Sequence, residues 1–253
     1  MISRESFNII TKKYGSVSSW AVWDDEGDKP KSNMSNMEIL DPDKNKKLLA
    51  MLNPCVIMIG LNFSRPVSFL KPYMNFHDNN PYANDFKIRF TFKDTPFYGA
   101  YMTDLFKNFP MLNSKNVEEY LKDNPNIIGE SINIFRQELK DIKSHEPIIF
   151  AFGLQVYNYL NSYLDKNEYS RLLKLTHYSH QICKEKYKID VHNKIYKYLD
   201  LHDNRSLGIN DITNVIEIQY KKYIDNIGNN QNKDIEIVKL KEVLQLFLKY
   251  LDK

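Results

Sequence analysis

The sequence contains little of three residue types that mark particular protein classes. It has 2 cysteines, 8 glycines and 10 prolines in 253 residues. So few cysteines exclude a disulfide scaffold and a four-cysteine iron–sulfur cluster. So little glycine and proline excludes collagen-like and low-complexity chains. Because neither Cys55 nor Cys183 has a CxxC or CxxH neighbour, we interpret both as buried, reduced thiols.

Long apolar runs and an excess of one charge are also missing. No stretch approaches the roughly 20 apolar residues of a membrane helix, and the N-terminal segment lacks the apolar core of a signal peptide. The chain carries 35 Lys and Arg against 32 Asp and Glu, a net charge of +3. This balance permits a nucleic-acid partner without arguing for one. We therefore expect a soluble, cytoplasmic protein with no membrane partner.

Apolar residues are plentiful and occur in alternating segments. Hydrophobic residues make up 42% of the chain and aromatic residues 13%, which is enough for the core of one sizeable domain. Branched apolar runs predict buried strands at residues 55–59, 98–103, 147–152 and 172–176. Helical stretches lie between them, at residues 117–121, 127–142 and 154–164. This alternation predicts an α/β fold, a three-layer sandwich with a central four-stranded parallel sheet.

The two ends of the chain follow other patterns. Near the N-terminus we expect a helix over residues 3–14, closed by Gly15, an edge strand over 18–23 and a helix over 43–52. After residue 190 two amphipathic stretches, 213–227 and 234–251, predict further helices. We therefore divide the chain into an α/β domain, 1–190, and a helical C-terminal appendage, 191–253. We expect the appendage to dock on the main domain or on a second copy of the chain.

Polar residues follow the predicted strands where a ligand would bind. In an open parallel sheet ligands bind at the carboxyl ends of the strands. Asn62, Asp104 and His177 each stand at or just after such an end. The glycine-rich phosphate motifs GxGxxG and GxxxxGK[ST] are absent, and the histidines lack metal-binding spacing. We expect no metal and no cofactor.

Four short segments, taken in order, resemble motifs of the uracil-DNA glycosylase superfamily. Residues 60–64, GLNFS, resemble motif A in its G-[LI]-N-P-[GS] form, and residues 177–180, HYSH, resemble motif B, H-P-S-P. Residues 101–105, YMTDL, resemble the third-strand motif Y-x-T-N-[VL], and residues 152–153, FG, resemble the L-G before motif B. The resemblance covers about residues 50–185. It implies a DNA glycosylase that cleaves the N-glycosidic bond of a damaged or modified base.

The resemblance also implies a mechanism in which the target nucleotide is flipped out of DNA into the site. Asn62 would orient the attacking water, and His177 would stabilise the departing base anion. The base would be bound by Gly60, Leu61, Phe63, Phe76 and Asp104, with Phe76 as the stacking ring. The DNA backbone would be contacted by Ser64, Ser179 and Lys184, helped by Lys186. Tyr178 or Ile182 would fill the gap left by the flipped base.

Departures from the family pattern bear on the substrate. Phe63 and Tyr178 replace the motif prolines, so both loops are less constrained than in the family. Asp104 stands where the family has Asn. An ionised carboxylate only accepts hydrogen bonds, so it suits the amino group of cytosine or adenine and not the keto group of uracil. Alternatively, Asp104 is the N-cap of a helix beginning at Leu105.

Plainer interpretations of these residues remain open. Asn62 can be a turn residue, His177 a satisfied strand-end histidine, Phe76 ordinary packing, and Lys184 part of a solvated face. At the level of the whole chain, one alternative is a catalytically inactive module of the same fold that binds nucleotides or nucleic acid. Another is an unrelated flavodoxin-like domain that dimerises through its C-terminal helices. The sequence leaves open which base is excised and whether the DNA is single- or double-stranded.

Overall fold

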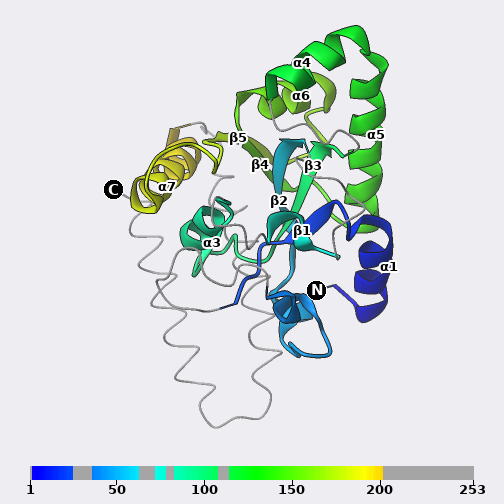
Figure 1. The fold of residues 1–253 in the computed structure, drawn as a ribbon, viewed down its shortest axis with the longest axis vertical. Coiled ribbons are helices and arrows are strands. Elements are labelled where there is room, and N and C mark those ends of the chain that lie inside the picture. Colours follow the sequence, from blue (N-terminus) through cyan, green and yellow to red (C-terminus); the bar gives the residue numbers. More distant parts are fainter. Residues whose placement is uncertain (1, 25–35, 63–71, 78–82, 108–113, 202–253) are drawn as a thin grey trace.

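The computed structural model describes residues 2–24, 36–62, 72–77, 83–107 and 114–201, and all that follows concerns these residues (Figure 1). Phe63 and Ser64, two of the expected site residues, lie outside them. So do the helices expected over 213–227 and 234–251, and with them most of the expected appendage.

The described chain forms a mostly parallel sheet with the strand order β1-β3-β2-β4-β5. The strands are β1 (Ser18–Trp20), β2 (Asn53–Asn62), β3 (Ala100–Phe106), β4 (Ile148–Phe152) and β5 (Arg171–Leu175). The strands β2 to β5 run parallel to one another, whereas β1 pairs antiparallel with β3. The sheet therefore has five strands and not the expected four, because part of the predicted edge strand joins it.

The described chain also contains helices and two short 3-10 turns. They are α1 (Arg4–Tyr14), α2 (Leu48–Met51), α3 (Phe86–Phe92), α4 (Ser114–Asp123), α5 (Asn126–Asp141), α6 (Leu154–Tyr163) and α7 (Lys184–Leu201), with short 3-10 turns η1 (Met37–Leu40) and η3 (Met74–Phe76). The expected helix over residues 43–52 is reduced to the single turn α2. Two helices, α3 and α7, and both 3-10 turns, η1 and η3, were not expected.

Capping explains the bounds of α1. Its first turn is closed by the Ser3 hydroxyl, which accepts a hydrogen bond from the Ser6 amide. Gly15 follows the last turn with φ −58°, an ordinary helical value. A Cβ on Gly15 would lie 2.4 Å from the Thr11 carbonyl oxygen, so close approach and not a left-handed turn requires glycine here.

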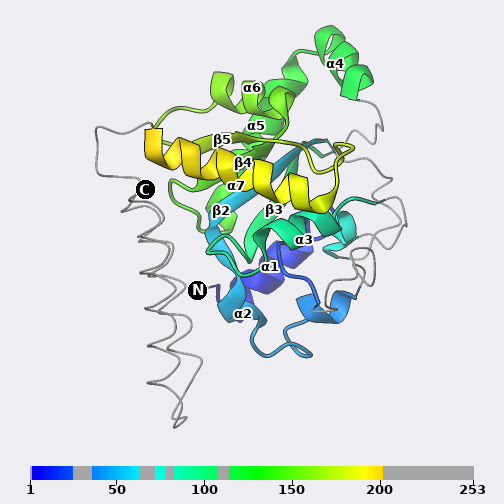
Figure 2. The same ribbon diagram turned by 90° about the vertical axis from the view of Figure 1, so that its left-hand side faces the viewer.

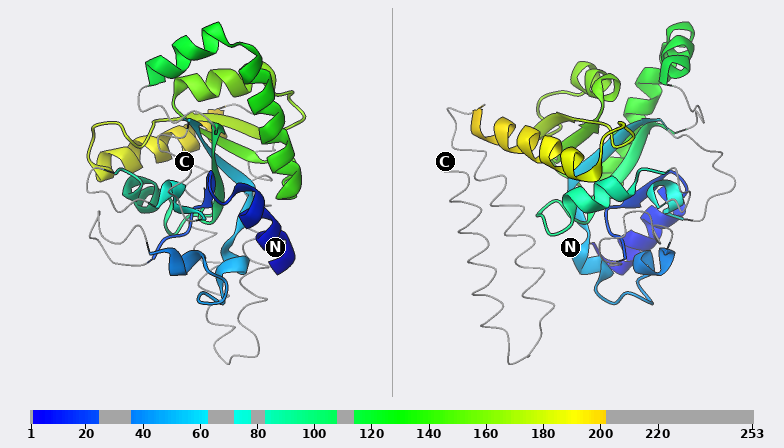
Figure 3. Two further views of the ribbon diagram at one scale, coloured as in Figure 1. Left: turned by 45° about the vertical axis from the view of Figure 1, so that its right-hand side comes forward. Right: turned by 60° about the vertical axis from the view of Figure 1, so that its left-hand side comes forward.

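Two apolar clusters fill the two faces of the sheet. One contains side chains from α1, α5 and α6 together with Ile57 and Ile59 of β2. The other contains side chains from α3 and α7 together with Val56 and Met58 of the same strand. Figures 1 and 3 show α3 and α7 on one side of the strands and α1 and α5 on the other. We call these the α5 face and the α7 face.

Helix α7 belongs to the α/β domain. It lies across the strands beside α3 (Figure 2), and its residues Val191 and Ile195 are buried in the α7-face cluster. The boundary expected after residue 190 therefore falls inside a helix that packs on the sheet. The expected burial of both thiols is wrong, since Cys55 is half-buried and Cys183 is exposed. None of the helices in the described ranges is long and apolar enough to cross a membrane.

Candidate functional site

The strand order creates a point where ligands commonly bind. From β2 the chain moves to β3 on one side and then returns to β4 on the other. The carboxyl ends of β2 and β4 therefore flank a topological switch point, where the connections leave in opposite directions and open a crevice. The residues that follow these ends, and those level with them on β3 and β5, form the candidate site.

Strand register brings Asn62 and His177 to the same level on the same face. Ile59 is paired with Ala151, and Phe152 with Leu175, so Gly60 is level with Leu175. Asn62 and His177 each lie two residues further along. Alternation along β2 places Asn62 on the α7 face, and the His177 ring contacts Phe152 of the α7-face cluster. Asn62 ends β2 and His177 follows β5, and β4 lies between these two strands.

The His177 ring is held in one orientation and one charge state. Its Nδ1 accepts a hydrogen bond from the Ser179 amide at 3.1 Å and lies 2.7 Å from the Ser179 hydroxyl. Because Nδ1 accepts, the neutral ring carries its hydrogen on Nε2. The ring stacks on Tyr178 with centroids 4.4 Å apart. Burial lowers the pKa of His177 to about 4, and the positive charge of Lys87 also lowers it.

Asp104 lies on the α7 face of β3, level with Gly60. Its Oδ2 accepts a hydrogen bond of 2.9 Å from Asn75 Nδ2, which also donates to the Val17 carbonyl at 3.2 Å. Its Oδ1 lies against Gly60, where an added Cβ would be only 2.2 Å away. Gly60 is therefore the residue that leaves room for this carboxylate. Asn75 uses both amide hydrogens, so its orientation is fixed.

The carboxyl group of Asp104 is an unusual acid. Its side chain is 5% exposed, and burial raises the pKa of Asp104 to about 6, although the hydrogen bond from Asn75 and the charge of Lys107 oppose the rise. The alternative that Asp104 caps a helix is wrong, because β3 continues through Leu105 to Phe106. Asp104 thus lies within a strand and not at a helix terminus.

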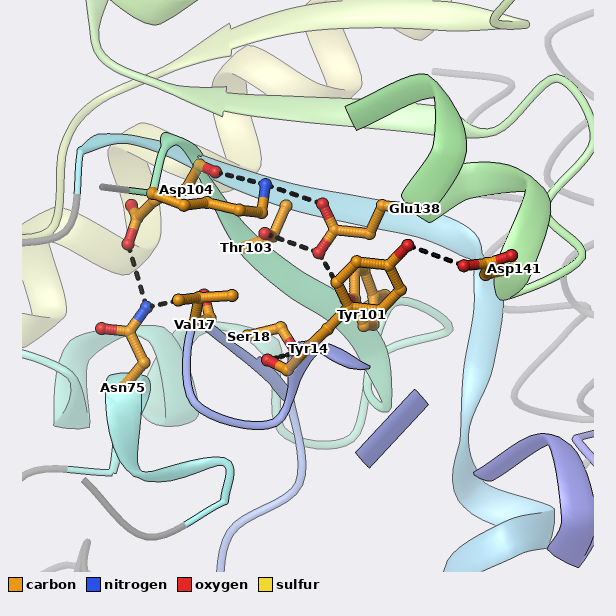
Figure 4. A network of polar contacts seen from close by, with 10 residues as sticks. Tyr14, Val17, Ser18, Asn75, Tyr101, Thr103, Asp104, Glu138 and Asp141 are labelled. Carbon is orange, nitrogen blue, oxygen red and sulfur yellow. Dashed lines mark hydrogen bonds and ion pairs between the residues drawn. The ribbon is translucent and has the colours of Figure 1, made fainter. Parts of the chain in front are cut away.

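A buried polar network supports β3 from the α5 face (Figure 4). Glu138 of α5 is fully buried and accepts hydrogen bonds from the Tyr101 hydroxyl at 2.5 Å and the Thr103 hydroxyl at 2.9 Å. Its other oxygen pairs with Lys107 Nζ at 2.7 Å, and Lys107 in turn donates to the Asp104 carbonyl at 2.8 Å. Burial and the charge of Glu138 raise the pKa of Tyr101 well above its ordinary value. The network therefore holds the Asp104 backbone in place from the α5 face of the sheet.

Two of the expected base-binding side chains are part of the core. Phe76 in η3 is 1% exposed and packs in the α7-face cluster. This agrees with the alternative interpretation of Phe76 as an ordinary packing residue. Its ring has no open face for stacking in this structure. Leu61 packs on the α5 face, so only its main chain faces the candidate site.

Ser179 and Lys184, two of the expected DNA-backbone contacts within the described ranges, are engaged with protein groups. The Ser179 hydroxyl is at the His177 ring, and Lys184 Nζ lies 4.5 Å from the centre of the Phe90 ring and 3.8 Å from Glu185. Tyr178 and Ile182 are half-buried against the α7-face cluster and are not free wedges.

Two residues of the site went unpredicted. Asn75 lies in a segment that we interpreted only through Phe76, and no local pattern marks an amide as the partner of a distant carboxylate. Lys87 of α3 lies between the predicted strands 55–59 and 98–103, where we expected no helix. Its signal, a lysine within an apolar segment, is weak because most such lysines lie on solvated faces.

These positions unite a neutral imidazole, a buried carboxyl and a strand-end amide at one edge of the sheet. Within the described ranges, no three His, Cys, Asp or Glu residues are grouped so as to hold a metal ion. Comparison with protein-family models, with curated proteins and with solved structures gives no match to this chain.

Proposed function

We propose that this chain is a DNA glycosylase of uracil-glycosylase-like fold that hydrolyses the N-glycosidic bond of an amino-bearing, damaged or modified base. The observation that carries the proposal is the placement of Asp104, a buried carboxyl group on the face and at the edge that Asn62 and His177 share. Buried carboxyl groups with a raised pKa are costly and cluster at functional sites. The four ordered motif resemblances supply the reaction class.

His177 is suited to stabilising a departing base. Its Nδ1 is occupied by Ser179, so Nε2–H is the remaining donor of a neutral ring. A neutral imidazole donates to an acceptor atom of the base, a carbonyl oxygen or a ring nitrogen, as negative charge develops there during bond cleavage. Ser179 then acts as the residue that orients the ring, in place of the phosphate contact expected from sequence.

Asp104 is suited to reading the edge of the base. One oxygen is held by Asn75 and the other lies over Gly60, so the carboxylate cannot rotate away. As an acceptor it favours an amino group, and an acceptor placed opposite a keto oxygen leaves both groups unsatisfied, which costs about 1–3 kcal/mol. This corresponds to a preference of about tenfold or more for an amino-bearing base.

Asn62 completes the site as the residue that orients water. It ends β2 on the α7 face, beside the switch point, where its amide can hold a water molecule against the sugar. The base leaves with the bonding electron pair, the cationic sugar is captured by that water, and the proton that the water loses neutralises the departing base anion.

The proposal is tested by base release from oligonucleotides that each carry one uracil, cytosine-type or adenine-type modified base, read as alkaline cleavage at abasic sites. Asn62→Ala and His177→Ala should each lower the rate by about 10²–10⁴. His145→Ala, in an exposed loop before β4, is the control and should retain the wild-type rate. Equal activity in the wild type and both site variants would contradict the proposal.

The assignment of Asp104 is tested on the same substrates. Asp104→Asn should move the preference from amino-bearing bases toward uracil, since an amide also donates. An unchanged ratio would show that Asp104 does not read the base. Tight binding of these oligonucleotides without release of any base would favour the inactive binding module instead.

A further inference from the structure

Lys87 of α3 reaches from the α7 face to the segment that carries His177. Its side chain is 4% exposed, and its Nζ donates a hydrogen bond of 2.7 Å to the His180 carbonyl. Burying an ammonium group is costly unless specific contacts offset the cost. We therefore look for a function of Lys87 that requires its buried position.

The carbonyl that Lys87 contacts belongs to a tight turn. The His180 amide donates to the His177 carbonyl at 3.0 Å, and the His180 carbonyl also accepts from the Ile182 amide at 2.8 Å. With Lys87 as a second donor, this carbonyl joins α3 to the turn. The turn holds both His177 and Ser179, the residue that fixes the His177 tautomer.

We propose that Lys87 is a positioning residue for His177, which fixes the His177–His180 turn through the His180 carbonyl and, together with burial, disfavours a second proton on the ring by placing an ammonium group nearby. The same positive charge favours the developing anion of the base, a part of the inference that rests on the proposed function. In agreement with this role, the charge of Lys87 lowers the pKa of His177 in addition to burial.

Other charged groups near this segment do not replace Lys87. Asp190 and Lys194 of α7 pair with each other at 2.8 Å and both contact the Thr176 hydroxyl, so their charges largely compensate. His180, at the end of the turn, is exposed. Arg89 of α3 is buried as well, but of the charges on this helix it is Lys87 that lowers the pKa of His177.

The experiment is an NMR titration of the His177 ring in the full chain, assigned with His177→Asn. In Lys87→Gln, which keeps a donor but loses the charge, the pKa of His177 should rise by about 0.5 to 1 pH unit. Lys87→Arg keeps the charge and should leave it near the wild-type value. Lys174→Gln removes an exposed lysine of β5, three residues before His177, and should also leave it unchanged.

An unchanged titration in Lys87→Gln would overturn the proposal. If Lys87→Gln does not fold, Lys87→Met, which keeps the apolar stem, gives the same readout. If neither folds while Lys174→Gln does, Lys87 is a structural residue and the proposal also fails. Base release should fall in Lys87→Gln and recover in Lys87→Arg. If the wild type releases no base, the proposed function fails, but the titration still decides the role of Lys87.

Discussion

At the scale of single residues, Asp104 is a buried carboxyl group whose neighbours only partly stabilise its ionised form. Asn75 supplies one hydrogen bond, and the charge of Lys107 helps, but the pKa remains raised to about 6. Proteins retain such groups at sites where function opposes stability. The Asp at this position could be identified from sequence, whereas its partner Asn75, 29 residues earlier, could not, because no local spacing links the two.

The raised pKa of Asp104 makes stability depend on pH. The folded-state value of about 6 exceeds the ordinary value of 3.8, so the folded protein binds the proton more tightly. The contribution is fully present below about pH 4 and is lost as pH rises through 6. Asp104→Asn should therefore be more stable than the wild type at pH 8, by up to about 3 kcal/mol, and the gain should shrink toward pH 4.

Urea unfolding of both proteins at several pH values measures this difference. The exposed Asp123→Asn serves as the control, because it removes a carboxylate that is in contact with solvent. A gain in Asp104→Asn that is the same at all pH values would show that Asp104 does not titrate as described.

At the scale of elements, the parallel strands and the longer helices follow from sequence patterns. Branched apolar runs identified β2, β4 and β5 because buried parallel strands need apolar side chains on both faces. The pattern ended β3 at Thr103, three residues early, because the buried Asp104 interrupts the apolar run. Helix α3 was missed because its sequence FKIRFTF alternates apolar and polar residues with the period of a strand. Tertiary contacts with α7 decide its conformation.

The contact between β2 and β3 predicts coupling between Gly60 and Asp104. Gly60→Ala should lower the free energy of unfolding by about 1–3 kcal/mol, because the new Cβ would meet Asp104 Oδ1. In an Asp104→Ala background the same substitution should cost much less. A double-mutant cycle by urea unfolding measures this coupling.

Gly129→Ala is the matched control for this cycle. Gly129 lies within α5, and nothing lies within 4 Å of an added Cβ. The substitution should stabilise the protein by about 0.5–1 kcal/mol through helix propensity. Equal costs of Gly60→Ala in both backgrounds would show that the carboxylate does not occupy the space above Gly60.

At the scale of the whole molecule, one sheet joins the two apolar clusters. The chain has 2 tryptophans, and each belongs to a different cluster: Trp20 to the α5 face and Trp23 to the α7 face. Both are buried, so each is a fluorescent reporter of its own face. The alternation of elements predicted a layer of helices on each face of the sheet. It did not predict which helices form each layer, because α3 and α7 were not expected.

We expect the two faces to unfold together. Phe135→Ala on the α5 face should lower the free energy of unfolding by about 3–5 kcal/mol. The loss should be the same whether unfolding is followed by Trp23, in a Trp20→Phe background, or by Trp20, in a Trp23→Phe background. Two distinct midpoints in urea would show that the clusters are separate cooperative units.

The strand order also determines how the sheet meets other molecules. In the part of the chain that the structure describes, the outer strands are β1, which is 3 residues long, and β5, which carries Arg171 and the exposed Lys174. Both edge strands are poor templates for an incoming strand. The short β1 offers few hydrogen bonds, and the charged side chains of β5 repel those of a second copy. The apolar middle strands are thereby shielded from edge-to-edge aggregation, the main hazard of a sheet this rich in branched residues.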